Sequence, residues 1–157
     1  MTTIAVSTVA LAAVAGTACG GSDDAPGTLS KGQFASKANA ICAEAQPVRA
    51  RLLQQLPAQP SGQADTGAFQ LLAGSDRYLI RHVDALVPPD AAQDLVDRVL
   101  DGWRKRSELE EKYATAVGAM QAAQSLEGFT ASLAQIDATI GPIATQLGMT
   151  HCTAGAS

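Results

Sequence analysis

The chain has 157 residues, of which 46% are hydrophobic and only 4% are aromatic. This length suits one domain, and a composition rich in alanine and poor in aromatics favours helices packed through small side chains. The formal net charge is -4, and the acidic residues are spread along the chain, which excludes nucleic acid as a partner on electrostatic grounds. We therefore expect an all-α fold.

Residues 1–18 have the features of a secretory signal peptide. Their apolar stretch, IAVSTVALAAVAGTA, is uncharged, ends in small residues directly before Cys19 and is too short to span a membrane comfortably. Residues 16–19 (GTAC) resemble a bacterial lipobox, in which the cysteine receives a lipid and becomes the N-terminus of the cleaved chain. The resemblance implies a flexible tether over residues 19–29 and an anchor in the outer face of the cell membrane. The alternative is a frayed apolar N-terminus on a cytosolic protein.

The first helix is predicted to begin after Ser30. Ser30 and Gln33 have the spacing of a capping box, and Leu29 precedes the cap where a hydrophobic staple would place it against Phe34. Apolar or small residues then recur four and three apart on one stripe: Phe34, Ala38, Ile41, Ala45, Val48 and Leu52. Pro47 is expected to kink this helix without ending it, because the stripe continues in phase beyond it.

Residues 57–67 (PAQPSGQADTG) lose the helical pattern and gain proline and glycine, which predicts a loop. A second helix is expected over residues 68–87, and Pro88 and Pro89 end it. Its inner residues are Phe69, Leu72, Leu79, Val83 and Leu86.

Asp90 and Gln93 have the spacing of a second capping box, which predicts the start of a third helix. The apolar residues of this helix lie on both sides of a charged segment at 104–108: Leu95, Val96, Val99, Leu100, Trp103, Leu109, Tyr113, Val117 and Met120. Residues 125–128 (SLEG) indicate a turn and a cap. The fourth helix repeats the alternation of the first: Phe129, Leu133, Ile136, Ile140, Ile143 and Leu147.

Short connections between the second and third helices and between the third and fourth make those neighbours antiparallel. We therefore expect an up-down-up-down four-helix bundle over residues 30–152, with a disordered tail at 153–157. Gly148 stands where a left-handed C-terminal cap is usual. The third helix is expected to be much longer than the second, so its second half is expected to pack mainly on the first and fourth helices. Residues 104–108 would then lie near the loop after the first helix.

Three cysteines suit an exported lipoprotein, in which Cys19 carries the lipid and Cys42 forms a disulfide with Cys152. Cys42 lies about 18 Å along the first helix at a rise of about 1.5 Å per residue, so the C-terminal tail must fold back along that helix. Closing so long a loop stabilises a fold by about 4 to 5 kcal/mol on the chain-entropy account. The alternative is a pair of buried free thiols.

Three short motifs of this chain resemble motifs found in a known group of proteins. The residues that carry the resemblance are Phe34, Lys37, Ala38, Asn39, Ile41 and Cys42, then Leu86, Pro88 and Pro89, then Leu147, Gly148 and Cys152. Together with the lipobox they resemble small, uncharacterised helical lipoproteins of actinobacterial cell envelopes. The resemblance covers residues 16–152 and implies a fold and a location, but no activity.

The candidates for chemistry are few. His82 is expected to be exposed or at the edge of the core and His151 to be a solvated tail residue, so no catalytic triad is expected. Two pairs of acidic residues have the spacing of metal ligands on a helix but no matching histidine: Asp94 with Asp97, and Glu108 with Glu111. The motifs CxxC, GxSxG, HExxH and the P-loop are absent from the sequence. We expect no metal, no cofactor and no enzymatic activity.

Arg106 falls in phase with Val99 and Trp103 and is therefore expected to point toward the apolar seam. Trp103, Arg104 and Arg106 are candidate contact residues, because a cation and an indole side by side could line a small anionic pocket or a partner surface. The alternative is that Arg106 only covers the edge of the core with its aliphatic stem.

These expectations favour a lipid-anchored, extracytoplasmic helical module that is monomeric, is not an enzyme and binds an envelope protein or a small ligand. The alternative is a structural or stress-related spacer protein of the envelope that takes no small ligand.

Overall fold

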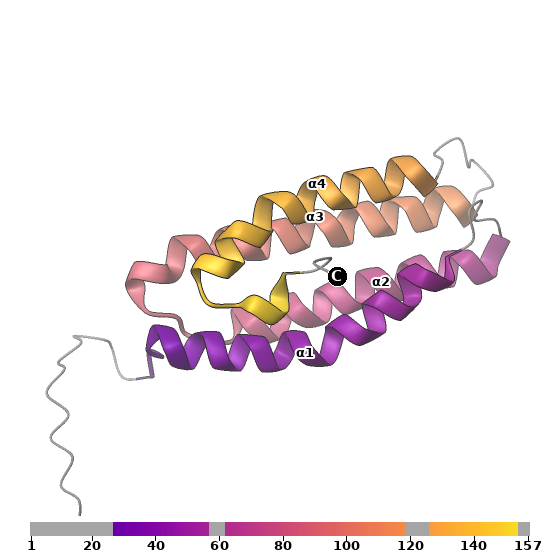
Figure 1. Cartoon of the computed structure of the whole chain (residues 1–157). Coiled ribbons are helices and arrows are strands. Elements are labelled where there is room, and N and C mark those ends of the chain that lie inside the picture. The colour runs from indigo at the N-terminus through magenta and orange to yellow at the C-terminus, as the bar shows by residue number, and fades with distance from the viewer. Residues whose placement is uncertain (1–26, 57–61, 119–125, 154–157) are drawn as a thin grey trace, which may run out of the picture.

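The computed structural model describes residues 27–56, 62–118 and 126–153. These ranges form four α-helices and two short 3₁₀ helices: α1 (Lys31–Gln55), α2 (Gly62–Asp84), η1 (Asp90–Ala92), α3 (Gln93–Gly118), α4 (Leu126–Gln146) and η2 (Thr150–Cys152). Successive α-helices run in opposite directions along one bundle axis (Figure 1). The prediction of an all-α, up-down-up-down four-helix fold is therefore confirmed. The predicted signal peptide, Cys19 and the tether up to residue 26 lie outside the described residues, as do residues 154–157 of the tail.

Helix α1 begins at the predicted cap. The Oγ atom of Ser30 accepts a hydrogen bond from the backbone N–H of Gln33 at 3.3 Å, and the Ser30 N–H donates to the Gln33 side chain at 2.9 Å. The N–H of Leu29 donates to the carbonyl of Val87 at 2.9 Å, so the last residue of the expected tether is already joined to the bundle. Helix α1 continues through Pro47, as expected.

The buried face of α1 differs from the predicted stripe in its second half. The buried residues are Phe34, Ala38, Cys42, Ala45 and Arg49. Val48, a predicted core residue, is 55% exposed, and Ile41 is only half-buried. The helix turns Cys42 and Arg49 inward in their place, because one forms a disulfide and the other forms ion pairs with neighbouring helices.

The second helix begins earlier than the sequence pattern indicates. Residues 62–67, predicted as loop, are the first turns of α2, and α2 ends at Asp84 ahead of the two prolines. Helices α2 and α3 are therefore nearly equal in length, with 23 and 26 residues. The expectation of a much longer third helix was wrong. Helix α3 packs most extensively on α2 over its length, and residues 104–108 lie half-way along the bundle rather than near the end of α1.

Two predicted helix starts also differ. Asp90 belongs to η1, whose N-cap Pro89 makes no side-chain capping bond, so the predicted capping box with Gln93 does not form. The Gln93 side chain instead donates to Asp97 at 3.0 Å. Helix α4 begins at Leu126, so the latter part of the predicted SLEG turn is helical, while Ser125 and Met120 lie outside the described residues.

The C-terminal segment folds back on α1, as the position of Cys42 required. Gly148 has a φ of +79°, and the N–H of Met149 donates to the carbonyl of Ala144 at 2.8 Å, which together close α4 with a left-handed cap. Helix η2 then packs against α1. The disulfide between Cys42 and Cys152 joins the two segments with a Cα–Cα distance of 5.1 Å. The predicted disulfide is confirmed.

Asn39 on α1 also binds this segment. Its amide nitrogen donates to the carbonyl of Gly148 and its amide oxygen accepts from the N–H of His151, both at 2.8 Å. The side chain therefore satisfies backbone groups where α4 has ended. Asn39, next to the seam residue Ala38, is one of the residues that carry the family resemblance, and its role here is structural.

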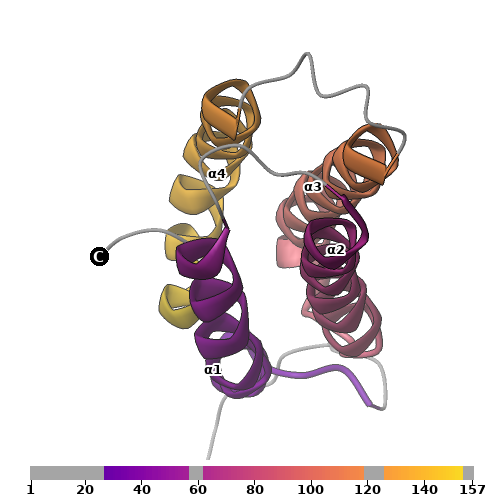
Figure 2. The same ribbon diagram turned by 90° about the vertical axis from the view of Figure 1, so that its right-hand side faces the viewer.

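The helices enclose a core with one weakly packed side. Helix α1 packs on α2, α2 on α3 and α3 on α4, whereas α1 and α4 make few direct contacts, and η2 contacts both of them. Seen along the bundle, α1 and α4 stand on one side and α2 and α3 on the other (Figure 2). No helix within the described ranges is long and apolar enough to cross a membrane.

The apolar core consists of two clusters at opposite ends of the bundle. The larger surrounds the disulfide and includes Phe34, Leu79, Val83, Leu100, Trp103, Ile140 and Leu147. The smaller contains Phe69, Leu72, Tyr113, Ala114, Val117, Phe129 and Leu133. Three of its aromatic rings meet one another at centroid distances of 4.6 to 5.1 Å. What separates the two clusters is a layer of charge.

Candidate functional site

A set of five charged residues crosses the bundle between the two apolar clusters, and we call it the charged layer. Every α-helix contributes to it: Arg49 from α1, Asp76 from α2, Arg106 and Glu110 from α3, and Asp137 from α4. The side chains are at most 3% exposed, except that of Asp137, which is 22% exposed. Charged residues are rarely buried to this extent unless they are paired.

Sequence reasoning identified only Arg106 of this layer. The sequence contained a signal for the other members, because each is a charged residue at a position that belongs to the apolar stripe of its helix. Asp76 follows Leu72 by four residues and precedes Leu79 by three, which is the gap left in the predicted stripe of α2. Asp137 stands likewise between Leu133 and Ile140 on α4. Because a helix buries every third or fourth residue on its inner face, the fold that buries the leucines also carries these aspartates inside.

Arg106 is the centre of the layer. Its Nε and Nη2 atoms donate to the two carboxylate oxygens of Asp76 at 2.7 and 2.6 Å, and its Nη1 atom donates to Oδ1 of Asp137 at 2.8 Å. Burial alone would lower the pKa of Arg106, but the charge and hydrogen bonds of Asp76, with the charges of Asp137 and Glu110, raise it above its ordinary value. The guanidinium is therefore permanently charged and joins α2, α3 and α4.

Arg49 adds the fourth helix to the layer. Its Nη1 atom donates to Oδ1 of Asp76 at 3.3 Å, and its Nη2 atom forms an ion pair with Oε1 of Glu110 at 2.7 Å. This contact pairs Arg49 with the buried carboxylate of Glu110 and so joins α1 to α3. Burial and the charge of Asp76 raise the pKa of Glu110 to about 7, against the opposing charge and hydrogen bond of Arg49 and the charge of Arg106.

The three candidate contact residues do not form a surface together. Trp103 and Arg106 are fully buried, whereas the Arg104 side chain is 45% exposed. Arg104 pairs with Asp101 at 2.6 Å and lies 3.9 Å from Asp84 on the outside of the bundle. Arg106 faces inward, as its phase indicated. Its guanidinium binds buried carboxylates there, so it neither lines a surface pocket nor covers the edge of the core.

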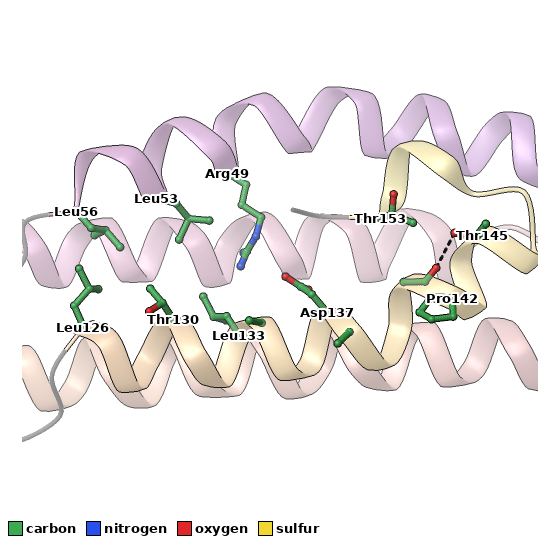
Figure 3. Close-up of a pocket in the computed structure, with 13 residues that line it drawn as sticks. Arg49, Leu53, Leu56, Leu126, Thr130, Leu133, Asp137, Pro142, Thr145 and Thr153 are labelled. Carbon is green, nitrogen blue, oxygen red and sulfur yellow. Dashed lines mark hydrogen bonds between the residues drawn. The ribbon is translucent and has the colours of Figure 1, made fainter. Parts of the chain in front are cut away.

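A cavity of about 700 Å³ opens between α1 and α4, and we call it the α1/α4 groove. Figure 3 shows its side chains in three zones along its length. Leucines gather at one end: Leu53, Leu56, Leu126 and Leu133. Arg49 and Asp137 point toward one another from the two helices in the middle, and Pro142, Thr145 and Thr153 lie at the other end.

The groove exists because the fourth side of the bundle is not closed by helix-to-helix packing. Helices α1 and α4 make few direct contacts, and η2, held to α1 by the disulfide, packs against both. Thr153, the residue after η2, lines the groove, although it was predicted to belong to a disordered tail. The C-terminal segment thus forms one end of the cavity, and two residues of the charged layer, Arg49 and Asp137, form the floor in its middle.

The histidines lie away from this groove. His82 is exposed and stacks on Tyr78 with ring centroids 4.2 Å apart. His151 is exposed beside the disulfide. In the part of the chain that the structure describes, no group of three or more His, Cys, Asp or Glu side chains could hold a metal ion. The acidic pairs with ligand spacing are exposed on α3: Asp94, Asp97, Glu108 and Glu111.

Comparison with known proteins identifies no relative of this chain. No protein-family model matches the chain. No curated protein and no solved structure matches it either. The likeness to actinobacterial envelope lipoproteins therefore stays a prediction from the motifs, and the function has to be argued from the charged layer and the groove.

Proposed function

We propose that this protein is a lipid-anchored binding protein of the outer face of the cell membrane, without enzymatic activity, that holds a small and largely apolar ligand in the α1/α4 groove. The groove itself carries this proposal. Its volume of about 700 Å³ falls within the range of about 300 to 1,000 Å³ that is usual for small-molecule sites. Its aliphatic walls and its two charged floor residues match the composition of such sites.

The surroundings of the groove favour binding over reaction. Arg49 is held by carboxylates from α2 and α3, and Asp137 is held by the buried Arg106, so both charged residues of the groove lining are fixed in place. The disulfide fixes the C-terminal segment at one end of the groove. Both histidines of the chain lie outside the groove lining. A preformed, rigid cavity binds a ligand with little loss of conformational freedom in the protein.

The anchor part of the proposal rests on residues 16–19 and is tested separately. Mass spectrometry of the protein isolated from cells should find an N-terminal Cys19 that carries a diacylglycerol. The Cys19→Ser variant should lose this mass and leave the membrane fraction. An unprocessed chain with an unmodified cysteine would refute the anchor and leave the groove proposal untouched.

The binding part is tested with the purified Cys19→Ser chain and N-phenyl-1-naphthylamine, a probe that fluoresces in apolar sites. Ala134 and Ala131 provide a matched pair, because both are exposed alanines of α4 but only Ala134 lines the groove. We expect Ala134→Trp to weaken probe binding by at least about ten-fold, the effect of about 1.4 kcal/mol, and Ala131→Trp to leave it unchanged.

Equal binding by the two tryptophan variants would place the probe elsewhere and refute the groove as the site. If the wild-type chain binds neither this probe nor envelope lipids, the alternative of a structural spacer without a small ligand is preferred. Circular dichroism of each variant shows whether the helices have formed.

A further inference from the structure

We propose that the α1/α4 groove selects ligands that carry a primary ammonium group on an apolar chain, and that the carboxylate of Asp137 is the point of recognition. This inference rests on the proposed function, because it names the class of ligand for the same groove. It is carried by the balance of charge in the charged layer and by the direction of the hydrogen bonds around the groove.

The charged layer contains three carboxylates and two guanidinium groups. It therefore carries one negative charge in excess when all five groups are ionised. Burial, together with the negative charge of Asp76, raises the pKa of Glu110, so a further negative charge in this layer is unfavourable. A cation delivered through the groove would supply the missing positive charge.

Asp137 is the member of the layer that a ligand can reach. Its side chain is 22% exposed, whereas the other four are at most 3% exposed. Only Oδ1 of Asp137 is engaged, by Arg106 at 2.8 Å, and among the described residues no donor binds Oδ2. Because Asp137 lines the groove, its second carboxylate oxygen is available to accept a hydrogen bond from a ligand there.

An anionic ligand finds no comparable partner. Among the described residues that line the groove, Arg49 is the one cation. Its two terminal nitrogens already meet Asp76 at 3.3 Å and Glu110 at 2.7 Å. Its side chain is 3% exposed. A carboxylate or phosphate entering the groove would have to displace these buried ion pairs and would also meet the charge of Asp137.

The hydroxyl groups that line the groove likewise favour a ligand that donates hydrogen bonds. All three lining threonines donate to a carbonyl of their own segment: Thr130 to Glu127 at 3.0 Å, Thr145 to Gly141 at 2.9 Å, and Thr153 to Thr150 at 2.8 Å. Their oxygens therefore remain available as acceptors only. The polar atoms that face the groove are thus predominantly acceptors, and a primary ammonium group brings three donors.

The zones of the groove also orient such a ligand. The apolar chain would lie against the leucine end, on Leu53 and Leu133, and the ammonium group would reach Asp137 in the middle (Figure 3). The apolar wall contributes affinity through buried area, and the carboxylate contributes selectivity.

The test is competition against the naphthylamine probe by four ligands with the same chain: decylamine, decanol, decanoate and decyltrimethylammonium, each below its micelle concentration at neutral pH. We expect decylamine to displace the probe at a concentration at least about ten-fold lower than decanol, because a charge-assisted hydrogen bond adds selectivity of that order. Decyltrimethylammonium, which has the charge but no donor, should bind more weakly than decylamine, and decanoate should bind most weakly.

Asp137→Asn keeps the shape and an oxygen acceptor for Arg106, and it should abolish the advantage of decylamine over decanol. Asp94→Asn is the control, because it removes one exposed carboxylate from α3, outside the groove lining, and should leave the advantage intact. If circular dichroism shows that Asp137→Asn does not fold, the order of affinity of the four ligands for the wild-type chain tests the ammonium selectivity instead.

The outcomes separate this inference from the proposed function. Equal displacement by decylamine and decanol would overturn the ammonium selectivity and leave the groove as an apolar site. Preference for decanoate would overturn it in favour of Arg49 as the recognition point. Failure of every ligand and of the probe itself would overturn the proposed function together with the inference.

Discussion

Glu110 lies in the middle of the bundle, where its buried carboxylate is paired with Arg49 at 2.7 Å. Three charged groups act on it: Arg49 on α1, Asp76 on α2 and Arg106 on α3. On α4, Asp137 pairs with Arg106. Burial and the negative charge of Asp76 raise its pKa from 4.5 to about 7. Near neutral pH this residue is therefore divided between a protonated form, which leaves the charged layer neutral, and an ionised form, which does not.

The sign of the resulting pH dependence follows from proton binding. Between pH 4.5 and about 7 the folded protein holds a proton on Glu110 that the unfolded chain has released. The contribution of the protonated Glu110 to the free energy of unfolding is therefore fully present below about pH 4.5, and it is lost as the pH rises through about 7. A shift of this size corresponds to a fall in the free energy of unfolding on the order of 3 kcal/mol.

We predict that Glu110→Gln removes this fall, because a neutral amide keeps the shape of the protonated acid. Urea unfolding at about pH 5 and about pH 8 measures the difference. Glu108→Gln is the control, since Glu108 is exposed on the same helix. A wild-type chain whose stability does not fall over this range, or a Glu110→Gln variant that retains the fall, would contradict the prediction.

The helices show how a local pattern is modified by what lies next to it. The cap at Ser30 forms as its spacing predicted, whereas the similar spacing at Asp90 does not, because Pro89 and the η1 turn take the place of a capped helix start. The inner face of α1 turns to bury Arg49 in place of Val48. Apolar periodicity locates a helix well, but ion pairs and a disulfide decide its final rotation.

The cap of α1 should be measurable on its own. Ser30→Ala removes the hydrogen bond to Gln33 and should lower the free energy of unfolding by about 1 kcal/mol. Ser36→Ala, on the exposed face of the same helix, is the control and should be neutral or slightly stabilising because alanine has the higher helix propensity. Equal effects of the two substitutions in thermal unfolding would count against the cap.

The contact between α3 and α4 depends on a glycine. A Cβ atom at Gly102 would collide with Cγ2 of Ile140, so α4 can approach α3 this closely only because position 102 has no side chain. Gly102→Ala should lower the free energy of unfolding by about 1 to 3 kcal/mol, because the two helices must separate or repack.

Gly67 in α2 provides the comparison, since a Cβ atom there meets nothing within 4 Å. Gly67→Ala should stabilise the protein by about 0.5 to 1 kcal/mol through helix propensity. Urea unfolding of both variants should therefore give effects of opposite sign. A stabilising Gly102→Ala would show that the helices are less closely packed than the structure indicates.

The whole molecule is held at its open side by one covalent bond. The disulfide links residues 110 positions apart and fixes η2 between α1 and α4, where the helices make few contacts of their own. The Cys42→Ala, Cys152→Ala double variant should lose about 4 to 5 kcal/mol of stability on the chain-entropy account.

The same double variant should bind the naphthylamine probe more weakly, because one end of the groove is no longer held in place. Urea unfolding and probe titration measure the two effects. Addition of reductant to the wild-type chain is the matched control and should reproduce both. A reduced chain as stable as the oxidised one would refute the role assigned to the disulfide.

The sequence by itself determined the helical class, the antiparallel order, the cap at Ser30 and the pairing of Cys42 with Cys152. These features depend on local periodicity, on short connections and on a small number of cysteines, all of which can be read along the chain. The start of α2 was missed because its first turns carry glycine and polar residues, which have weak helix propensity.

Only the tertiary structure decided the charged layer and the groove. Arg106 meets Asp76 thirty residues before it and Asp137 thirty-one residues after it, and nothing local in the sequence pairs them. The positions of Asp76 and Asp137 in the apolar stripes indicated that they are buried, but not which residues they pair with. The groove depends on a distance between α1 and α4 that η2 sets from outside both helices. Such long-range geometry arises only when all four helices are packed, because each partner is supplied by a different one.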